Sequence, residues 1–300
     1  MRTLDNKAGE GIIKLSVMSI YKNKLQIFIT LVFLGFLIWW ISFQSVVTQQ
    51  GESVKWFSGT DGLVALIGAI IGFFASRKWG GFKTVLGKSL MFFTIGLFAQ
   101  EAGQLIYTYY VYGANIQIPY PSWGDVAYFG STLSYIAGAY YLSKAAGVKF
   151  SLKSTKYKAI AFIVPVVLLA ASYGILLHNH QYDTSHPITV FLDFGYPMGE
   201  AIYISLAITA YLLSRKLLGG VMRAGITLVI VALLVQYVSD SNFIYQSSRG
   251  TYLGGQYADL LYLIAYYVMA IAMIKFHLIY NGLRTKTAEL KKSYKSGVAD

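Results

Sequence analysis

Eight apolar stretches, each about as long as a bilayer-spanning helix, constrain this chain more than any other feature of its sequence. A helix needs roughly 20 apolar residues to cross a hydrocarbon core of about 30 Å. Hydrophobic residues make up 56% of the 300 residues and charged residues only 13%, against about 25% charged residues in soluble domains. The sequence therefore predicts an all-α polytopic membrane protein with eight transmembrane helices. The predicted spans are Leu25–Val46, Thr60–Ser76, Thr84–Tyr109, Trp123–Ser143, Lys158–His178, Thr189–Leu213, Val221–Phe243 and Gly255–Ile279.

The basic residues are distributed unevenly between the two sides of these spans. Of the 25 Lys and Arg residues, 23 fall on the side that holds the N-terminus, and only Lys55 and Arg249 fall on the other side. By the positive-inside rule, both termini are predicted to be cytoplasmic in a multi-pass protein of the cell membrane. Topology and contact with the lipid bilayer explain the net charge of +12. No nucleic-acid partner is expected.

The sequence divides into three predicted parts. Residues 1–24 form a cytoplasmic amphipathic lead-in, residues 25–283 the eight-helix transmembrane domain, and residues 284–300 a basic cytoplasmic tail. The lead-in is too long and too mixed in composition for a cleaved signal peptide. Nothing in the sequence resembles a second domain.

The inventory of reactive residues argues against catalysis. The chain contains no Cys, which excludes thiol chemistry, disulfides and Cys-based metal centres. It also lacks the common zinc-hydrolase, serine-hydrolase and phosphate-loop motifs. Lys88 and Lys275 lie too near the ends of their spans for a retinal Schiff base, and no facing His pair suggests haem. We therefore expect neither an enzyme nor a cofactor.

An acid followed three positions later by Tyr recurs in the spans that run inward. The instances are Asp125/Tyr128, Asp193/Tyr196, Glu200/Tyr203 and Asp259/Tyr262. The first and last of these pairs are each preceded, at a similar distance, by Gln100 or Gln236. The pattern predicts repeated helical hairpins, most clearly for 84–143 and 221–279. Repeats of this kind usually place a shared site at their interface.

Six acids fall within or at the edges of the predicted spans, without a Lys or Arg placed to pair with them. An ionised carboxylate in hydrocarbon costs about 2.5–3.5 kcal/mol on insertion scales, so these acids should face the protein interior. Positions 193, 196, 200 and 203 share one helical face, which puts two acids and two Tyr side chains together. The six acids are Glu101, Asp125, Asp193, Glu200, Asp240 and Asp259.

These observations predict an outward-facing acidic pocket, rich in Tyr, with Glu200 at its base. Tyr hydroxyls can satisfy carboxyl groups, and Tyr rings attract cations. The pocket would hold a cation, a protonated amine or a proton. Its predicted ligand-binding residues are Glu101, Asp125, Asp193, Tyr196, Glu200, Tyr203, Asp240, Asp259 and Tyr262.

A purely structural interpretation competes with this one. Ser122 and Asp125 have capping-box spacing, and Asp259 also lies near the start of its predicted helix, where an acid is favoured. Glu101 and Asp240 lie toward the C-terminal ends of their helices, where the helix dipole opposes a negative charge. A buried network that only fixes helix packing therefore remains the alternative.

The connection between the fifth and sixth predicted spans is rich in His. His178, His180 and His186 lie within nine residues of one another, with Asp183 among them. His and Asp are common metal ligands, so this segment could hold a surface metal ion. Short polar loops also contain His without any metal.

The segment Pro121-Ser122-Trp123-Gly124-Asp125-Val126-Ala127-Tyr128-Phe129 resembles a P-S-x-x-D-x-x-Y element of known membrane domains. Those are multi-pass sensor domains that precede diguanylate cyclase and histidine kinase modules in bacteria. The chain is also similar to uncharacterised standalone membrane proteins of candidate-phyla bacteria. The resemblance implies a sensor in a bacterial inner membrane and names no ligand. No output module follows Lys295, so signalling would need a separate partner.

Three functions remain open from the sequence. The leading hypothesis is a membrane sensor or receptor-like domain whose acidic, Tyr-rich pocket binds a small cationic ligand or a proton. The first alternative is a proton- or cation-coupled transporter that uses the same acids, and the second is a scaffold subunit of a membrane complex. The partners considered are the lipid bilayer, a small cationic ligand or proton, a separate signalling protein and a second copy of the chain.

Overall fold

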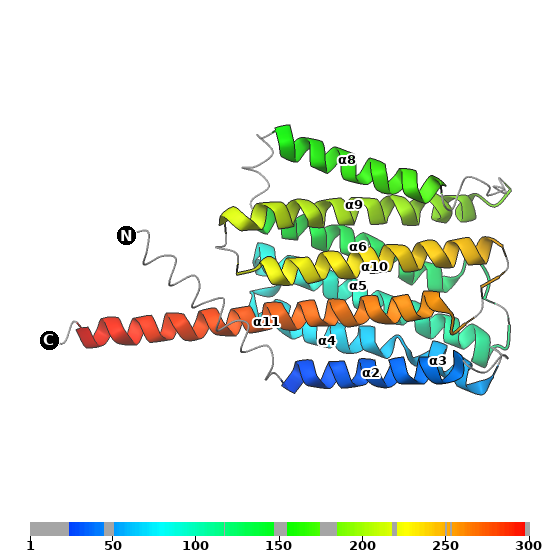
Figure 1. Cartoon of the computed structure of the whole chain (residues 1–300), viewed down its shortest axis with the longest axis horizontal. Helices are drawn as coiled ribbons and strands as arrows, with labels where there is room; N and C mark the ends of the chain where they lie inside the picture. Colours follow the sequence, from blue (N-terminus) through cyan, green and yellow to red (C-terminus); the bar gives the residue numbers. More distant parts are fainter. Residues whose placement is uncertain are drawn as a thin grey trace.

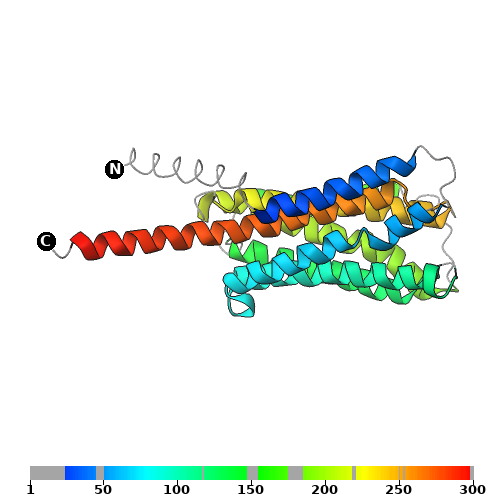
Figure 2. The same ribbon diagram turned by 90° about the horizontal axis from the view of Figure 1, so that it is seen from below.

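The computed structural model describes residues 24–44, 51–116, 118–146, 155–174, 185–217, 221–249, 251–252 and 254–297. These residues form long helices that lie along one common axis as a bundle, as Figures 1 and 2 show, and they contain no strand. The all-α prediction is confirmed. The α-helices are α2 (Lys24–Gln44), α3 (Glu52–Thr60), α4 (Leu63–Lys78), α5 (Val85–Thr108), α6 (Trp123–Ala145), α8 (Thr155–Ser172), α9 (Pro187–Leu217), α10 (Arg223–Ser248) and α11 (Tyr257–Gly297).

Each predicted span overlaps one of these helices, and four helical segments are long and apolar enough to cross a membrane. They are Lys24–Gln44, Ser53–Lys78, Arg223–Gln246 and Tyr257–Lys291. Helices α5, α6 and α9 carry several buried hydroxyl, amide or acidic side chains, which make them less apolar. The structure thus supports a membrane location by length and composition, whereas the count of eight spans and the side on which the termini lie stay predictions.

Six helices form a closed ring in the described part of the chain. Helices α4, α5, α6, α9, α10 and α11 each pack on the next one, and α11 packs back on α4. Helix α2 lies outside the ring against α11, and α8 lies outside it against α9 (Figure 1). The ring brings the two predicted hairpins, α5–α6 and α10–α11, into one bundle.

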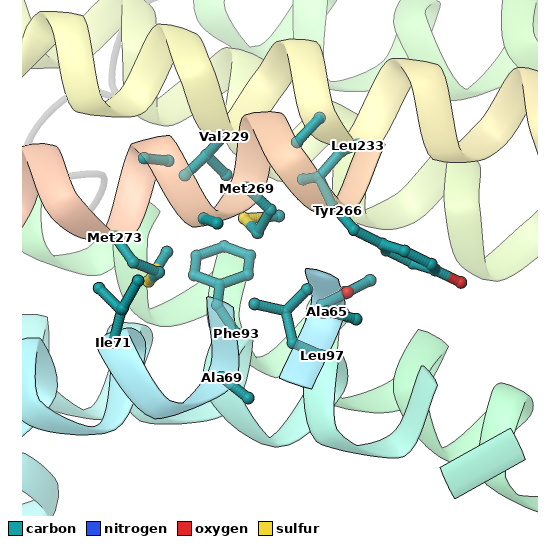
Figure 3. Packing of buried hydrophobic residues seen from close by; sticks show 14 of the residues in the cluster. Ala65, Ala69, Ile71, Phe93, Leu97, Val229, Leu233, Tyr266, Met269 and Met273 are labelled. Carbon is teal, nitrogen blue, oxygen red and sulfur yellow. The ribbon is translucent and has the colours of Figure 1, made fainter. Parts of the chain in front are cut away.

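Small residues on α4 allow the ring helices to approach closely. Figure 3 shows Ala65 and Ala69 near Phe93 and Leu97 of α5, in a buried apolar cluster that also includes residues of α10 and α11. A Cβ added to Gly68 would lie only 3.1 Å from the Cβ of Ala270 on α11. Close approach of this kind is typical of helix contacts through small residues. The middle of the ring is therefore apolar.

The two ends of the bundle differ. The connections α5–α6 and α10–α11 lie at the end that holds α3, which we call the α3 end (Figure 1). At the opposite end, α11 continues past the other labelled helices as a single rod (Figures 1 and 2). Its residues 282–291 are exposed. The predicted tail from Arg284 therefore continues α11 as a helix through Gly297.

Candidate functional site

A small cavity of about 50 Å³ lies at the α3 end of the ring. A water molecule needs about 10–15 Å³ of such space, so the cavity has room for a few water-sized groups and not for a large organic ligand. Seven of its lining residues are Tyr, contributed by four ring helices and two connections. The walls are formed by Asp61, Gln104, Tyr107, Tyr120, Asp125, Tyr128, Tyr196, Asp240, Phe243, Ile244, Tyr252, Asp259, Tyr262 and Tyr266.

The carboxyl groups that line this cavity are not balanced by basic side chains. Its walls include four carboxyl side chains, and no Lys, Arg or His is among the lining residues. Interactions between charges are stronger in such a partly dry site than in water. A small cation that entered would therefore meet a strongly favourable environment. The four carboxyl groups belong to Asp61, Asp125, Asp240 and Asp259.

Asp125 begins α6 and has hydrogen-bond donors on both of its oxygens. The backbone N–H and the Oγ of Ser122 donate to Oδ2 over 2.7 and 2.8 Å, which completes the predicted capping box. The Tyr107 hydroxyl donates to Oδ1 over 3.2 Å. The Tyr196 hydroxyl on α9 donates to the Asp125 backbone carbonyl, also over 3.2 Å. Asp125 thus both caps α6 and ties α5 and α9 to it.

Asp259 plays a similar part at the start of α11. The Gly255 backbone N–H and the Ser58 Oγ donate to Oδ2, the latter over 3.0 Å, and the Tyr252 hydroxyl donates to Oδ1 over 2.8 Å. Burial and the neighbouring Asp259 raise the pKa of Tyr252, which lies in the α10–α11 connection. The Tyr252 hydroxyl therefore remains a donor at neutral pH.

Asp240 lies in the last third of α10 and accepts two hydrogen bonds. The Tyr262 hydroxyl donates to Oδ1 over 2.6 Å, and the Gln236 Nε2 donates to Oδ2 over 3.0 Å. Both donors belong to the α10–α11 hairpin. The helix dipole opposes a negative charge on Asp240 at this position, and two direct hydrogen-bond donors offset that effect.

The two hairpins make the same bond at corresponding positions. In α10–α11 the Tyr262 hydroxyl donates to Asp240, and in α5–α6 the Tyr128 hydroxyl donates to Gln104 over 2.8 Å. Each Tyr follows the first acid of its helix by three positions, and each acceptor follows a Gln by four. This agreement supports the predicted repeat of the two hairpins.

Three other acids are buried without a full set of partners. The Oδ1 of Asp61, the Oε2 of Glu101 and both carboxyl oxygens of Glu200 are buried and accept or donate no hydrogen bond. Their residues are 3%, 6% and 1% exposed. The Tyr203 hydroxyl, on the same helix as Glu200, also lacks a partner. Buried polar groups are normally satisfied, so each exception calls for an explanation.

The structure separates the predicted ligand-binding residues into two groups. Those that line the cavity are Asp125, Tyr196, Asp240, Asp259 and Tyr262. Those that are not among its lining residues are Glu101, Asp193, Glu200 and Tyr203. Asp193 accepts a 2.8 Å hydrogen bond from Tyr120, which is itself a lining residue. Glu200 lies behind the wall, beside Asp240. A role in ligand binding stays a prediction for all nine.

One lining acid was not among the predicted site residues. Asp61 occupies the turn between α3 and α4, and it lies close enough to Asp259 and Glu101 for their charges to interact. The sequence does contain a signal for it, because Thr60-Asp61-Gly62 begins an apolar stretch in the manner of a helix start. Tyr120 and Tyr252 were missed as well, since both reach the cavity from connections.

The predicted metal site falls largely outside the described residues. His178 and His180 belong to that part of the chain. His186 is described and lies exposed just before α9, where its Nδ1 is 3.1 Å from the Ser185 Oγ. Among the described residues, no three His, Asp or Glu side chains are grouped so that they could hold a metal ion. The metal site stays a prediction.

A second and larger cavity of about 330 Å³ adjoins the first. The two cavities share Gln104, Tyr107 and Tyr252 as lining residues. The larger one also contacts α3 through Lys55 and Ser58. We call it the vestibule, because it shares walls with the smaller cavity and borders α3.

Comparison with known proteins adds no further constraint. No protein family, no curated protein and no solved structure matches this chain.

Proposed function

We propose that this chain is a membrane sensor or receptor-like domain whose small acidic cavity binds a monovalent cation or a proton. One observation carries the proposal: four Asp side chains line a cavity of about 50 Å³ without a basic residue among its walls. Asp61 offers an acceptor atom that a ligand can use, because its buried Oδ1 has no hydrogen-bond partner. The other three acids already accept hydrogen bonds from the protein.

The dimensions and the wall chemistry favour particular cations. Room for a few water-sized groups suits ammonium, a short primary amine, an alkali ion or a hydrated proton, and it is too small for a polyamine. Tyr rings in the walls add cation–π attraction for such ions. Ca²⁺ takes six to eight oxygen ligands. Among the described residues, no three acidic or His side chains are placed so that they could hold one metal ion together, which argues against a divalent ion.

The proposed topology has eight spans with both termini in the cytoplasm. The charge distribution supports it, since Lys55 and Arg249, the two basic residues on the opposite side, both belong to segments at the α3 end. The vestibule would then open to the exterior. Reporter fusions after Lys83 and Arg215 should be cytoplasmic, and fusions near Ser53 and Ala114 should be external. Reversal of two of them would contradict the topology.

Helix α11 supplies a physical link between the cavity and the opposite end of the bundle. Asp259 lies in its first turn, and the same helix runs without interruption to Gly297, beyond the other labelled helices (Figure 1). A change of charge or hydrogen bonding at Asp259 would act on one end of a continuous rod. This arrangement and the resemblance of the Pro121–Phe129 segment to bacterial sensor domains favour sensing, with a separate signalling partner at the exposed end of α11.

A second candidate function is proton- or cation-coupled transport. The observation that favours it is Glu200, a carboxyl that is 1% exposed and unpartnered, in the helix that contains Pro197. An ionisable group inside a membrane helix often marks an ion pathway. Transport would require a polar path from Glu200 to the other end of the bundle.

Thermal unfolding in lipid nanodiscs tests the cation site with ions of increasing size. Ammonium and methylammonium should stabilise the protein, and tetramethylammonium at the same ionic strength should not, because it exceeds the cavity. A ligand at about a hundredfold excess over its Kd stabilises by about 2.7 kcal/mol, which such a measurement detects. Asp61→Asn should remove the stabilisation.

Glu289→Gln is the control. Glu289 is an exposed acid on α11, and it does not line the cavity. This variant should respond to ammonium like the unaltered protein. Equal stabilisation by all three ions, or equal responses of the two variants, would contradict a size-limited site at Asp61.

A further inference from the structure

We infer that Glu200 is a second, inner site that stores one proton and is loaded from the cavity through Asp240. The inference rests on the proposed function, because it takes the cavity as the route by which protons reach the bundle. It goes further by naming the group that keeps the proton and the group that passes it on. The geometry of five acid and Tyr side chains on four ring helices, together with Gln236, supports it.

Glu200 is enclosed by groups that cannot balance a negative charge. It is 1% exposed, and neither of its oxygens has a hydrogen-bond partner. The titratable groups around it are Asp240 on α10, Tyr203 on its own helix and, one layer away, Tyr135 on α6 and Tyr262 on α11. No basic side chain is among these neighbours. An isolated carboxylate there would be very costly, so the neutral acid is the form that fits.

The hydrogen bonds assign the proton to Glu200 rather than to Asp240. Asp240 accepts bonds from Tyr262 and Gln236, and donors of this kind favour the charged form of a carboxyl. Glu200 accepts none. The pair is therefore best described as one carboxylate, Asp240, beside one neutral acid, Glu200, whose O–H can point toward it. The pair holds a single proton.

Access to Glu200 passes through Asp240. Asp240 is a lining residue of the cavity, whereas Glu200 is not. A proton from cavity water would first join the Asp240 carboxylate and then move to a Glu200 carboxylate, which returns Asp240 to its charged form. The net result is one proton transferred from water to Glu200, with no bond to carbon made or broken.

Below Glu200, the described residues of α9 itself offer no polar continuation toward the opposite end of the bundle. The Tyr203 hydroxyl is buried and unpartnered, and the next buried hydroxyls on α9 are turned to their own helix. Ser205 donates to the Ala201 carbonyl over 2.6 Å, and Thr209 donates to the Ser205 carbonyl over 2.8 Å. The surrounding α9 residues Ile204, Ala207, Ala210 and Leu213 belong to the apolar core.

The described arrangement is thus a proton store with access from one side. A stored proton can report the acidity at the α3 end, and α9 offers it no polar path to the opposite end of the bundle. Glu200, which favours transport when considered alone, therefore fits a sensor of protons better than a conductor of them.

Infrared spectroscopy of the protein in lipid nanodiscs tests the inference without any added cation. At neutral pH the spectrum should contain a carbonyl band of a protonated carboxylic acid that Glu200→Gln removes. Incorporation of ¹³C-labelled Glu should shift this band, which identifies it as Glu even if the variant folds poorly. In deuterated buffer the band should shift as the proton exchanges. Asp240→Asn should keep the band and slow this exchange about tenfold or more, as a barrier raised by about 1.4 kcal/mol would.

Glu289→Gln serves as the control, because Glu289 is exposed on α11 and does not line the cavity, and it should leave both the band and its exchange rate unchanged. A spectrum without a Glu band sensitive to Glu200→Gln would overturn the proton store. Exchange that is equally fast in Asp240→Asn would overturn the route. Both results are independent of the ammonium experiment. If the unaltered protein lacks the Glu band but responds to ammonium, only the inner site is contradicted. If it shows the Glu band but does not respond to ammonium, only the cation site is contradicted.

Discussion

Asp125 and Glu200 are buried carboxyl groups on two helices that pack against each other, yet their surroundings are opposite. Asp125 receives two bonds from Ser122 and one from Tyr107, whereas Glu200 receives none. Both are at least 97% buried, so burial does not distinguish them. The number of donors does. A carboxylate surrounded by donors holds helices together, and an unsatisfied one is free to take a proton or a cation.

The same division extends across the cavity. Asp259 is satisfied by Ser58, Tyr252 and Gly255, whereas its neighbour Asp61 keeps an oxygen without a partner. Each of the two pairs, Asp125 with Glu200 and Asp259 with Asp61, thus combines a satisfied acid with an unsatisfied one. Stability and ligand binding should therefore depend on different members of the same cluster, and this expectation can be tested one residue at a time.

The largest loss of stability is expected for Asp125→Ala. The change leaves the Ser122 N–H and the Tyr107 hydroxyl without their acceptor and removes the Asp125 half of the capping box of α6. Each buried donor left unpaired costs about 1–3 kcal/mol, so a total of about 3 kcal/mol is expected. Thermal unfolding in nanodiscs measures it. An unchanged unfolding temperature would show that the donors around Asp125 do not hold the helices together.

A smaller loss is expected for Gly124→Ala, which disturbs the same contact without touching the acid. The added Cβ would lie 2.3 Å from the Tyr107 ring and would push its hydroxyl away from Asp125. Displacing a packed ring costs about 1–3 kcal/mol. Gly130→Ala on the same helix is the control, because its Cβ would meet nothing within 4 Å. Equal unfolding temperatures for the two variants would argue against the Tyr107–Asp125 contact.

The smallest effect on stability is expected for Glu200→Gln. Gln keeps the size of the side chain, and the Glu200 oxygens make no hydrogen bond that the change could break. The free energy of unfolding should change by less than about 1 kcal/mol, within the range of substitutions that break no named interaction. A loss as large as that of Asp125→Ala would place Glu200 among the structural acids and remove the distinction between the two classes.

The parts of the site that depend on neighbouring residues could be predicted from the sequence. Ser122 and Asp125 form the capping box that their spacing predicts, and Tyr262 lines the cavity together with Asp259, three positions before it. These relations span one turn of a helix. They need no knowledge of how the helices are arranged.

The parts that depend on the closed ring could not be predicted in this way. Asp61 meets Asp259 only because α11 packs on α4, which no local pattern indicates. Glu200 shares a helical face with Tyr196, as its spacing predicts, but four residues of helix rise by about 6 Å. That rise is enough to carry Glu200 past the wall of a cavity this small, while Tyr196 remains in the wall.

The most direct test of the central claim compares Asp61→Asn with Asp125→Asn in one thermal unfolding measurement, each with and without ammonium. The account predicts that Asp61→Asn unfolds near the temperature of the unaltered protein but is not stabilised by ammonium. It predicts that Asp125→Asn unfolds at a lower temperature yet keeps part of the ammonium response. If both variants lose the same stability and the same response, the acids form a single structural network and the division between holding the fold and holding a ligand is wrong.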